Sequence, residues 1–477
     1  MDNVARRVTS NFTWLLTRDV LFRSMFFFGT LYIARVLETA EFGLFSFAMA
    51  VSNSMWIAVD LGVTLYGIRE VARSPDKAEE LLGVLNSLRF LASVLTFSVF
   101  FLVLTLADVP PHKRSVLLAA GLYLITYALS PDWLLRGTET MKYLSIGNLI
   151  MALVFLPSIF FLVKGPGDTT WAAFLWSLSV FFGSVATTYL LWKKLGIKFF
   201  FTFSLSKWRE HFKELIYFAL ITLVTRVYIY LPVLLLGFLT TPHEVGIFSA
   251  PSRLCLLITV NFALPQAFYP VLASLHQDIE AFKKARYNFQ KIMTAIGLPI
   301  GVGSTILAKD IIRLLYGSSY LEGADVLKII IWAVPITFIR MTYGQSLLVL
   351  GLQRFHAIAT GMGILITFIL NLFLIPIYGV YGAALALPVG EITVLFFMAL
   401  IFSKKVYKSI PFDAYFVKVC IACVFMGVVI KTVDVNIIIR LILGVISYGI
   451  LVMVLGIAKR ETILGFYSNI IRNRKKE

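Results

Sequence analysis

Long apolar segments recur along almost the whole chain, and they restrict it to folds that cross a membrane many times. A helix that spans the hydrocarbon core needs about 20 mostly apolar residues. Because lipid offers no hydrogen-bond partners, every backbone group in such a segment must be paired inside the chain, which predicts α-helices. The expected spans are 12–35, 42–66, 81–106, 115–134, 143–163, 171–192, 212–239, 246–272, 288–308, 325–350, 355–375, 380–403, 414–431 and 437–458, fourteen in all.

The composition agrees with an all-α polytopic membrane protein. Hydrophobic residues make up 59% of the 477 residues and charged residues 14%, against about 45–50% and about 25% in soluble domains. The net charge of +17 is expected to set orientation and to contact lipid head groups, so no nucleic-acid partner is expected. Cys255, Cys420 and Cys423 all lie in apolar segments, which predicts helix packing and no metal or redox site.

Lysine and arginine are concentrated on one side of the predicted topology. That side carries the N-terminus, the connections after even-numbered spans and the C-terminus. Cytoplasmic loops of membrane proteins carry such an excess, so both termini are expected in the cytoplasm. The first residues contain no short apolar core followed by a small-residue cleavage site, which predicts an uncleaved first span.

Two internal matches indicate a duplicated architecture. The sequence EFGLFS at 41–46 matches EVGIFS at 244–249, and Gly147 corresponds to Gly361 in a second match between equivalent connections. Matches in the same order at equivalent spans are typical of transporters built from parallel repeats. The predicted domains are an N-lobe of six spans at 1–195, a cytoplasmic amphipathic linker at 196–211, a C-lobe of six spans at 212–405, and two further spans with a basic cytoplasmic tail at 406–477.

Several motifs resemble those of polysaccharide-type flippases. They are ARVLETAEFGLF at 34–45, DLG at 60–62, REVAR at 69–73, PDWLLRG at 131–137, MKY at 141–143, GIF at 246–248 and YGVYGAA at 378–384. Through these residues the chain is similar, over roughly 5–405, to the O-antigen and exopolysaccharide (Wzx-type) flippases of the multidrug/oligosaccharidyl-lipid/polysaccharide exporter superfamily. The resemblance is specific for the family and does not identify the glycan.

The resemblance implies a V-shaped pair of six-helix lobes around a central cavity in the cytoplasmic (inner) membrane. It implies a flippase, not an enzyme, that carries a polyprenyl-phosphate- or polyprenyl-diphosphate-linked oligosaccharide to the outer leaflet by alternating access. A proton or sodium gradient would drive transport, with no other cofactor. The expected partners are the lipid-linked oligosaccharide, membrane lipids, a glycan polymerase and glycosyltransferases. Two complete repeats in one chain predict a functional monomer.

Four arginines inside predicted spans are candidate substrate-binding residues. By helix and approximate depth, Arg18 and Arg23 on span 1 and Arg253 on span 8 match arginines that the related lipid II flippases use, and Arg226 lies on the equivalent span 7. A charge at bilayer depth costs on the order of 3 kcal/mol, so it faces a partner or a wet cavity. A guanidinium group binds phosphate oxygens bidentately. The alternative is an interhelical salt bridge or a local pair such as Asp19 with Arg23.

Four other charged residues are candidates for coupling or gating. Asp60 and Asp132 lie near the predicted cytoplasmic ends of spans 2 and 4. The arginines expected near them are Arg69, Arg73, Arg89 and Arg136. This arrangement predicts ion pairs that close a gate, or capped and snorkelling helix ends. Arg340 and Glu391 predict a structural pair within the C-lobe, and Glu391 is alternatively a protonatable coupling site.

Two other functions are alternatives. A multidrug or cation exporter of the same superfamily would need acidic residues at its site, whereas arginine predominates within these spans. A membrane-embedded glycan polymerase or ligase would need a long outer loop with catalytic residues. The longest outer connection, around 309–325, is short and has no acid, base and nucleophile together, so transport is favoured.

Overall fold

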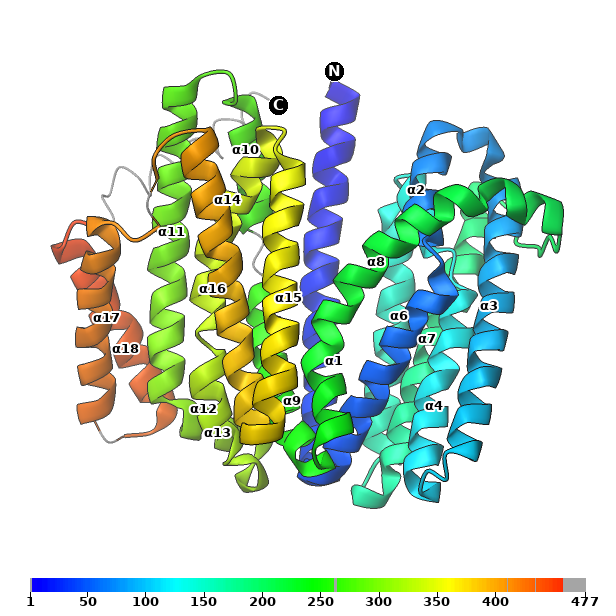
Figure 1. The fold of residues 1–477 in the computed structure, drawn as a ribbon, viewed down its shortest axis with the longest axis horizontal. Helices are drawn as coiled ribbons and strands as arrows, with labels where there is room; N and C mark the ends of the chain where they lie inside the picture. Colours follow the sequence, from blue (N-terminus) through cyan, green and yellow to red (C-terminus); the bar gives the residue numbers. More distant parts are fainter. Residues whose placement is uncertain (1, 261–263, 410, 434, 458–477) are drawn as a thin grey trace. The chain divides into compact units, whose positions relative to one another are not determined.

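The chain is helical throughout the part that the structure describes. A computed structural model describes residues 2–260, 264–409, 411–433 and 435–457, with side chains described from Ser24 onward except at 220–221, 224–228, 260, 264 and 266–267. No β-strand occurs in these ranges, so the all-α prediction is confirmed. Contacts divide the chain into two compact units, Met1–Ala250 and Pro251–Glu477 (Figure 1).

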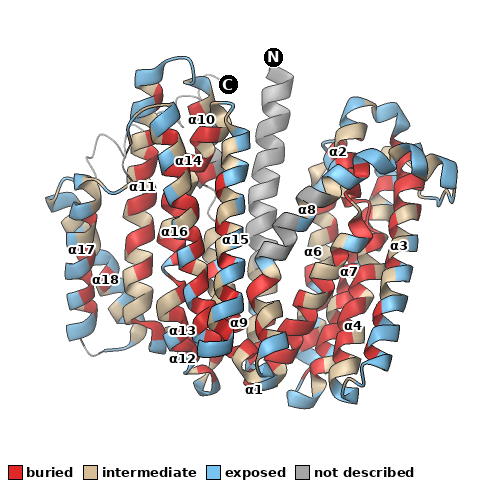
Figure 2. Cartoon of the chain, viewed as in Figure 1, coloured by how far each residue is buried: buried red, intermediate tan, exposed pale blue. Residues whose placement is uncertain are grey.

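The first unit contains α1 to α8 and the first turns of α9. Its helices are α1 (Asp2–Asp60), α2 (Val63–Arg73), α3 (Ala78–Leu106), α4 (Pro111–Ala128), α5 (Asp132–Gly137), α6 (Met141–Leu162), α7 (Thr169–Leu195), α8 (Leu205–Leu239) and α9 (Pro242–Val260). Buried residues lie inside the bundle, and the outer side of α3 is largely exposed (Figure 2). Leu95, Val99 and Leu106 are among the exposed apolar residues of α3, as expected of a helix that contacts lipid.

Two backbone breaks divide the first part of this unit. Glu38 interrupts α1 with a φ of 63°, so α1 consists of two helical segments. The break lies between the predicted spans 12–35 and 42–66, where the sequence predicts a break. The helix then ends at Asp60, because Leu61 and Gly62 take φ angles of 48° and 84°. The predicted second span, 42–66, is therefore wrong at its end. A Cβ on Gly62 would collide with the backbone of α8, which explains the need for glycine there.

The segment predicted as an amphipathic linker packs on the first unit. Residues 196–204 form no helix, and α8 then runs from Leu205 to Leu239 without a break. The amphipathic stretch and the predicted seventh span are thus one helix. The backbone N–H of Thr202 donates to the Gly83 carbonyl of α3 at 3.1 Å, which fixes the connection against the bundle. The division into an N-lobe at 1–195 and a C-lobe at 212–405 is not tested and stays a prediction.

The second unit contains the rest of α9 and α10 to α18. Its remaining helices are α10 (Leu264–Ser274), α11 (Ile279–Ile306), α12 (Ala308–Tyr316), α13 (Gly323–Ile330), α14 (Ala333–Val349), α15 (Gln353–Tyr378), α16 (Val380–Lys405), α17 (Ala414–Thr432) and α18 (Ile437–Val454). The last two helices pack on α11 through a cluster that contains Leu298, Val419 and Cys423. The packing role predicted for this cysteine is confirmed.

The described helices include many that can cross a membrane. Eight of them are long and apolar enough to do so, or nine if α11 and α12, which meet at 78°, form one span. Each of the fourteen predicted spans overlaps a helix or two successive helices. The protein is therefore a multi-pass membrane protein.

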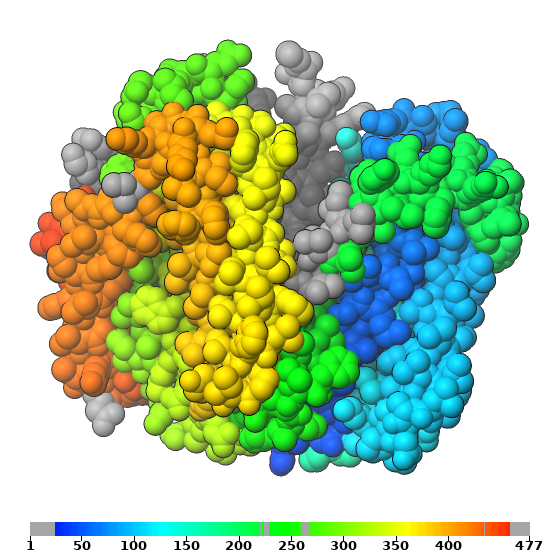
Figure 3. Space-filling model, in the orientation of Figure 1, coloured from blue at the N-terminus to red at the C-terminus, as the bar shows by residue number. Residues whose placement is uncertain are grey.

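Both units contain a helix pair that crosses closely at glycines. In the first unit, a Cβ on Gly183 of α7 would lie 3.2 Å from the Gly147 carbonyl oxygen of α6. In the second unit, α15 and α16 lie side by side (Figure 3), and a Cβ on Gly363 would lie 3.1 Å from the Gly390 carbonyl oxygen. Equivalent helix pairs thus pack in the same way. The predicted counterpart of Gly147 is wrong, because Gly361 faces open space and Gly363 makes the contact.

The two copies of the six-residue repeat lie against each other within the first unit. A Cβ on Gly43 of α1 would overlap the Pro242 carbonyl oxygen at the start of α9. A Cβ on Gly246 of α9 would overlap the Thr39 carbonyl oxygen of α1. Because each glycine admits the backbone of the other copy, the matched sequences form one close helix crossing.

Candidate functional site

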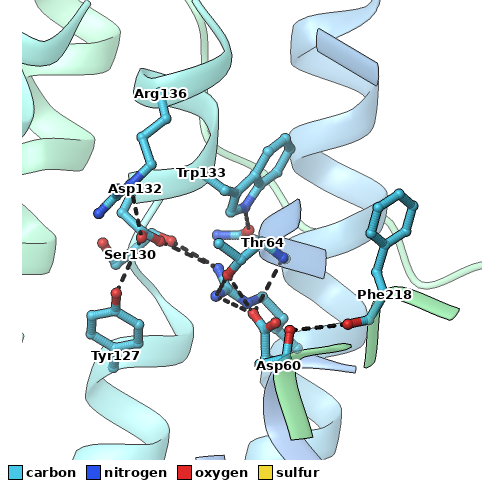
Figure 4. Close-up of polar contacts among 11 residues, drawn as sticks. Asp60, Thr64, Tyr127, Ser130, Asp132, Trp133, Arg136 and Phe218 are labelled. Carbon is cyan, nitrogen blue, oxygen red and sulfur yellow. Dashed lines mark hydrogen bonds and ion pairs between the residues drawn. The ribbon is translucent and has the colours of Figure 1, made fainter. Parts of the chain in front are cut away.

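Several helix ends of the first unit meet around one buried arginine, Arg89 of α3. Asp60 is the last residue of α1, and Asp132 is the first residue of α5, directly after Pro131. Arg89 is 0% exposed, Asp60 1% and Asp132 4%. Buried charges must be paired, and Figure 4 shows the polar contacts that pair them. We call Asp60, Thr64, Arg89, Tyr127 and Asp132 the Arg89 cluster.

Asp60 is held tightly within the Arg89 cluster. Arg89 Nη2 donates to Asp60 Oδ1 at 2.7 Å and to Thr64 Oγ1 at 3.0 Å. The Thr64 hydroxyl and backbone N–H donate to the same Asp60 oxygen at 2.6 Å and 3.3 Å. Asp60 therefore neutralises Arg89 and satisfies a backbone donor in the first turn of α2. The Arg89 guanidinium also lies over the Trp56 ring, with its central carbon 4.9 Å from the ring centroid, a favourable cation–π geometry.

Asp132 is held more loosely than Asp60. Its Oδ1 lies 3.6 Å from Arg89 Nη1, and its Oδ2 lies 3.8 Å from Arg136 Nε. The hydroxyl of Tyr127 donates to Oδ2 at 3.1 Å. Because the Arg136 side chain is 41% exposed, Asp132 connects the buried cluster to the outside of the unit. The ion pairs predicted for Asp60 and Asp132 with Arg89 and Arg136 are therefore present.

The Arg89 cluster joins α1, α3 and α5 through charge. One guanidinium faces two carboxylates that come from separate helix ends, and it has no exposed surface with which to contact a phosphate or a sugar. Breaking a buried pair by removing one partner costs about 3–5 kcal/mol. The cluster is thus suited to locking the end of α1 and the starts of α2 and α5 against the interior of α3. A role of Asp60 and Asp132 in gating or coupling stays a prediction.

Arg69 and Arg73 do not belong to the Arg89 cluster, contrary to the prediction. Arg69 pairs with Glu70 at 2.8 Å and with Glu214 of α8, and Arg73 lies 3.8 Å from Glu70. The hydrogen bond with Glu214 raises the pKa of Arg69 above its ordinary value. These groups hold the beginning of α8 against α2. Because these side chains are partly or largely exposed, solvent and salt screen the pairs and they contribute little to stability.

Three of the four predicted substrate-binding arginines have side chains outside the described residues. They are Arg18 and Arg23 on α1 and Arg226 on α8. The fourth, Arg253 on α9, is partly buried. Contact of these arginines with substrate stays a prediction.

Arg340 and Glu391 form the structural pair that the sequence predicts. Arg340 Nε on α14 donates to Glu391 Oε2 on α16 at 2.7 Å, and both side chains are largely buried. The pair therefore ties neighbouring helices of the second unit. Use of Glu391 as a protonatable coupling site is not tested by this geometry.

Sequence reasoning missed a second buried arginine, Arg286 of α11. Its Nε donates to the Tyr407 hydroxyl at 2.7 Å and its Nη1 to Gln290 Oε1 at 3.2 Å, while Nη2 donates to Ser409 Oγ. Its guanidinium also lies over the rings of Tyr343 and Phe402. These groups clamp the connection between α16 and α17. A signal was available, since Arg286 shortly precedes a predicted span, but all of its partners except Gln290 lie more than 50 residues away in the chain.

The central place of Arg89 was also missed, although it was expected near the two aspartates. Its signal is an arginine in the middle of the apolar sequence LNSLRFLASV at 85–94. In the described part of the chain, no three His, Cys, Asp or Glu side chains gather in a way that could hold a metal ion.

The fold and these sites define a polytopic helical membrane protein with repeated helix pairs. The sequence matches the family model described as polysaccharide biosynthesis protein over residues 8–276. The chain therefore belongs to the polysaccharide biosynthesis protein family, and the family resemblance of its motifs is confirmed.

Relatives of known name agree with this assignment. The chain is 24% identical over 311 residues to the putative O-antigen transporter of Escherichia coli K12, covering 63% of this chain and 73% of the relative. It is 23% identical over 414 residues to the capsular polysaccharide biosynthesis protein CapF of Staphylococcus aureus, covering 84% of this chain and 100% of the relative.

A solved structure shares the fold. The inward closed conformation of the lipid II flippase MurJ is similar with a TM-score of 0.73 and 18% identity, covering 96% of this chain and 99% of that protein. At this identity, the similarity shows the fold and carries no residue roles.

Proposed function

We propose that this protein is a flippase that moves a polyprenyl-phosphate- or polyprenyl-diphosphate-linked oligosaccharide from the cytoplasmic to the outer leaflet. The observation that carries the proposal is membership of the polysaccharide biosynthesis family over residues 8–276 in a chain with the fold of a lipid-linked sugar flippase. A relative named as an O-antigen transporter supports the same class of cargo. The protein acts in the cytoplasmic membrane with both termini in the cytoplasm, an orientation that the distribution of basic residues supports. It acts as a monomer, because one chain carries two repeats.

The repeated helix crossings support transport by alternating access. Close glycine crossings recur in equivalent helix pairs, α6 with α7 and α15 with α16. The copies of the six-residue repeat also cross, at Gly43 and Gly246. Rigid helix pairs with a narrow crossing can rock against one another without repacking their interiors. In this scheme, Arg18, Arg23, Arg226 and Arg253 bind the anionic head group of the cargo.

Two charged groups are proposed to respond to the driving gradient of protons or sodium ions. The Arg89 cluster and the Arg340–Glu391 pair each place carboxylates in low-exposure sites. Charges in such sites are expensive unless paired. Protonating or binding a cation at one carboxylate would weaken its hold on arginine, and could thereby free the attached helix ends.

Transport in proteoliposomes tests the proposal. Defined lipid-linked oligosaccharides are reconstituted with wild type, Arg18→Ala and Arg253→Ala under imposed proton or sodium gradients, and sugar that reaches the far leaflet is measured. Each substitution is expected to lower the rate at least tenfold, since a charge-assisted phosphate contact is worth about 1.5–3 kcal/mol. Arg354→Ala, at an exposed position at the start of α15, is the matched control. Normal rates in both variants would remove the arginine assignment, and absence of transport by the wild type would remove the function.

A further inference from the structure

A groove on the first unit has the shape and charge of a lipid site. It has a volume of about 560 Å³ and is lined by Leu129, Ser184, Val185, Thr188, Tyr189, Trp192, Lys198 and Phe199. This volume falls within the range of about 300–1,000 Å³ that is typical of small-molecule pockets. None of the lining residues is acidic.

The walls of the groove follow one side of α7 toward its C-terminal end. Ser184, Thr188 and Trp192 recur at the spacing of four residues that places side chains on one helix face. At a rise of about 1.5 Å per residue, this stretch extends for about 12 Å. Leu129, directly after α4, contributes a further apolar side chain to the lining. The groove therefore runs along the helix, as an acyl chain does in a bilayer.

One lysine lines the groove, and a second contacts the lining residue Tyr189. Lys198 is a lining residue in the connection after α7. Lys193 Nζ donates to the Tyr189 hydroxyl at 3.0 Å and lies over that ring at 5.4 Å from its centroid. Neither lysine forms an ion pair with a carboxylate of the described residues. The groove therefore has two ammonium groups beside it that no carboxylate of the described residues neutralises.

The residues around the groove are typical of a membrane–water interface. Tyr189 and Trp192 are about half exposed, and Phe200 and Phe203 of the following connection are also exposed. Exposed aromatic residues beside lysines mark the level of lipid head groups. By the distribution of basic residues, this end of α7 faces the cytoplasm.

We propose that this groove binds an anionic phospholipid of the cytoplasmic leaflet. Its phosphate lies between Lys193 and Lys198, and one acyl chain runs along Val185 toward the middle of α7. Charge complementarity selects an anionic head group over a zwitterionic one, because basic pockets beside helices on the cytoplasmic side attract anionic lipids. The inference does not depend on which cargo the protein moves.

Native mass spectrometry of the full-length protein with added lipid tests the site. Phosphatidylglycerol and phosphatidylcholine with identical acyl chains are titrated into delipidated wild type, Lys193→Gln/Lys198→Gln and Lys404→Gln/Lys405→Gln. The control pair lies at the end of α16, the counterpart of α7, and Lys405 also lies over an aromatic ring, at 4.4 Å from the Phe355 centroid. The groove variant is expected to bind phosphatidylglycerol about tenfold more weakly than wild type and the control pair, with no change for phosphatidylcholine.

Three results would overturn the proposal. They are equal losses in both lysine pairs, equal affinity of the wild type for both lipids, and displacement of phosphatidylglycerol by a polyprenyl phosphate at lower concentration. The last result would assign the groove to the transported lipid. If the groove variant does not fold, quenching of tryptophan fluorescence by brominated phosphatidylglycerol in liposomes measures whether this lipid contacts Trp192. Trp192→Phe should then remove more of the lipid-selective quenching than Trp171→Phe, which changes an equally exposed tryptophan near the other end of α7.

Discussion

Arg89 in the first unit and Arg286 in the second are both buried, but different groups hold them. Arg89 lies between the carboxylates of Asp60 and Asp132. Arg286 has no carboxylate within ion-pair distance among the described residues, and its donors reach the hydroxyls of Tyr407 and Ser409. Both guanidinium groups lie over aromatic rings, one ring for Arg89 and three for Arg286.

The comparison separates two ways to keep a cation away from water. The Arg89 cluster depends on charge, because without the guanidinium Asp60 would have no counter-charge and Asp132 would keep only its longer pair with Arg136. The Arg286 site depends on shape, because a planar group with several donors is needed to reach the hydroxyls and to stack on the rings. Charge-altering variants should therefore affect the first site most, and shape-altering variants the second.

Replacing Arg89 is expected to have the largest effect. Arg89→Gln leaves Asp60 buried without a counter-charge and leaves Asp132 only the partly exposed Arg136 at 3.8 Å, so it should lower the free energy of unfolding by about 3–5 kcal/mol. Thermal unfolding in detergent, followed by tryptophan fluorescence, measures the loss. Arg286→Gln is the matched control. It should lower the free energy of unfolding by less, because it leaves no carboxylate buried without a counter-charge. A smaller loss for Arg89→Gln than for Arg286→Gln would contradict the comparison.

The two aspartates of the Arg89 cluster should differ from each other. Asp60 accepts hydrogen bonds from Arg89 and Thr64 at 2.6–3.3 Å, whereas Asp132 lies 3.6 Å or more from both of its arginines. Asp60→Asn should therefore cost about 3 kcal/mol and Asp132→Asn about 1 kcal/mol. The same unfolding measurement compares them. Equal losses would mean that the two carboxylates share the guanidinium evenly.

A conservative substitution distinguishes charge from shape. Arg286→Lys keeps the charge but loses the planar stacking and two of the donor directions, so it should cost about 2 kcal/mol. Arg89→Lys keeps a cation between the carboxylates and should lose less than Arg89→Gln. Limited proteolysis of the connection between α16 and α17 provides a local readout for Arg286→Lys. If Arg286→Lys is neutral while Arg286→Gln is not, charge and not shape holds that site.

The sequence allowed prediction of the helices better than of the clusters. Apolar length is a local property, so the spans and the break at Glu38 were predictable. The break at Leu61 and Gly62 was not, because it lies within an apolar run and depends on a close approach to α8. For the same reason, Gly361 could not be distinguished from Gly363 by alignment of short matches, since only packing shows which glycine touches α16.

The Arg89 cluster illustrates the same limit for site residues. Asp60, Arg89 and Asp132 come from distant parts of the chain, and their pairing is decided by tertiary packing. Proximity in the topology placed Arg69 and Arg73 with the aspartates as readily as Arg89. Both arginines are on α2, however, where they pair with Glu70, and Arg69 also pairs with Glu214 of α8. The useful signal was the position of Arg89 well inside a predicted span, because an arginine within an apolar helix requires a buried partner.

Arg136 should show the smallest effect of the charged residues that touch Asp132. Its Nε lies 3.8 Å from Asp132 Oδ2, and its side chain is 41% exposed. An exposed pair at this distance is worth about 0.2–1 kcal/mol and is screened by salt. Arg136→Gln should therefore change the unfolding free energy by no more than about 1 kcal/mol, and raising the salt concentration should shrink the difference from wild type. A loss as large as that of Arg89→Gln, unaffected by salt, would mean that Asp132 depends on Arg136 for its counter-charge and that the cluster is centred on two arginines.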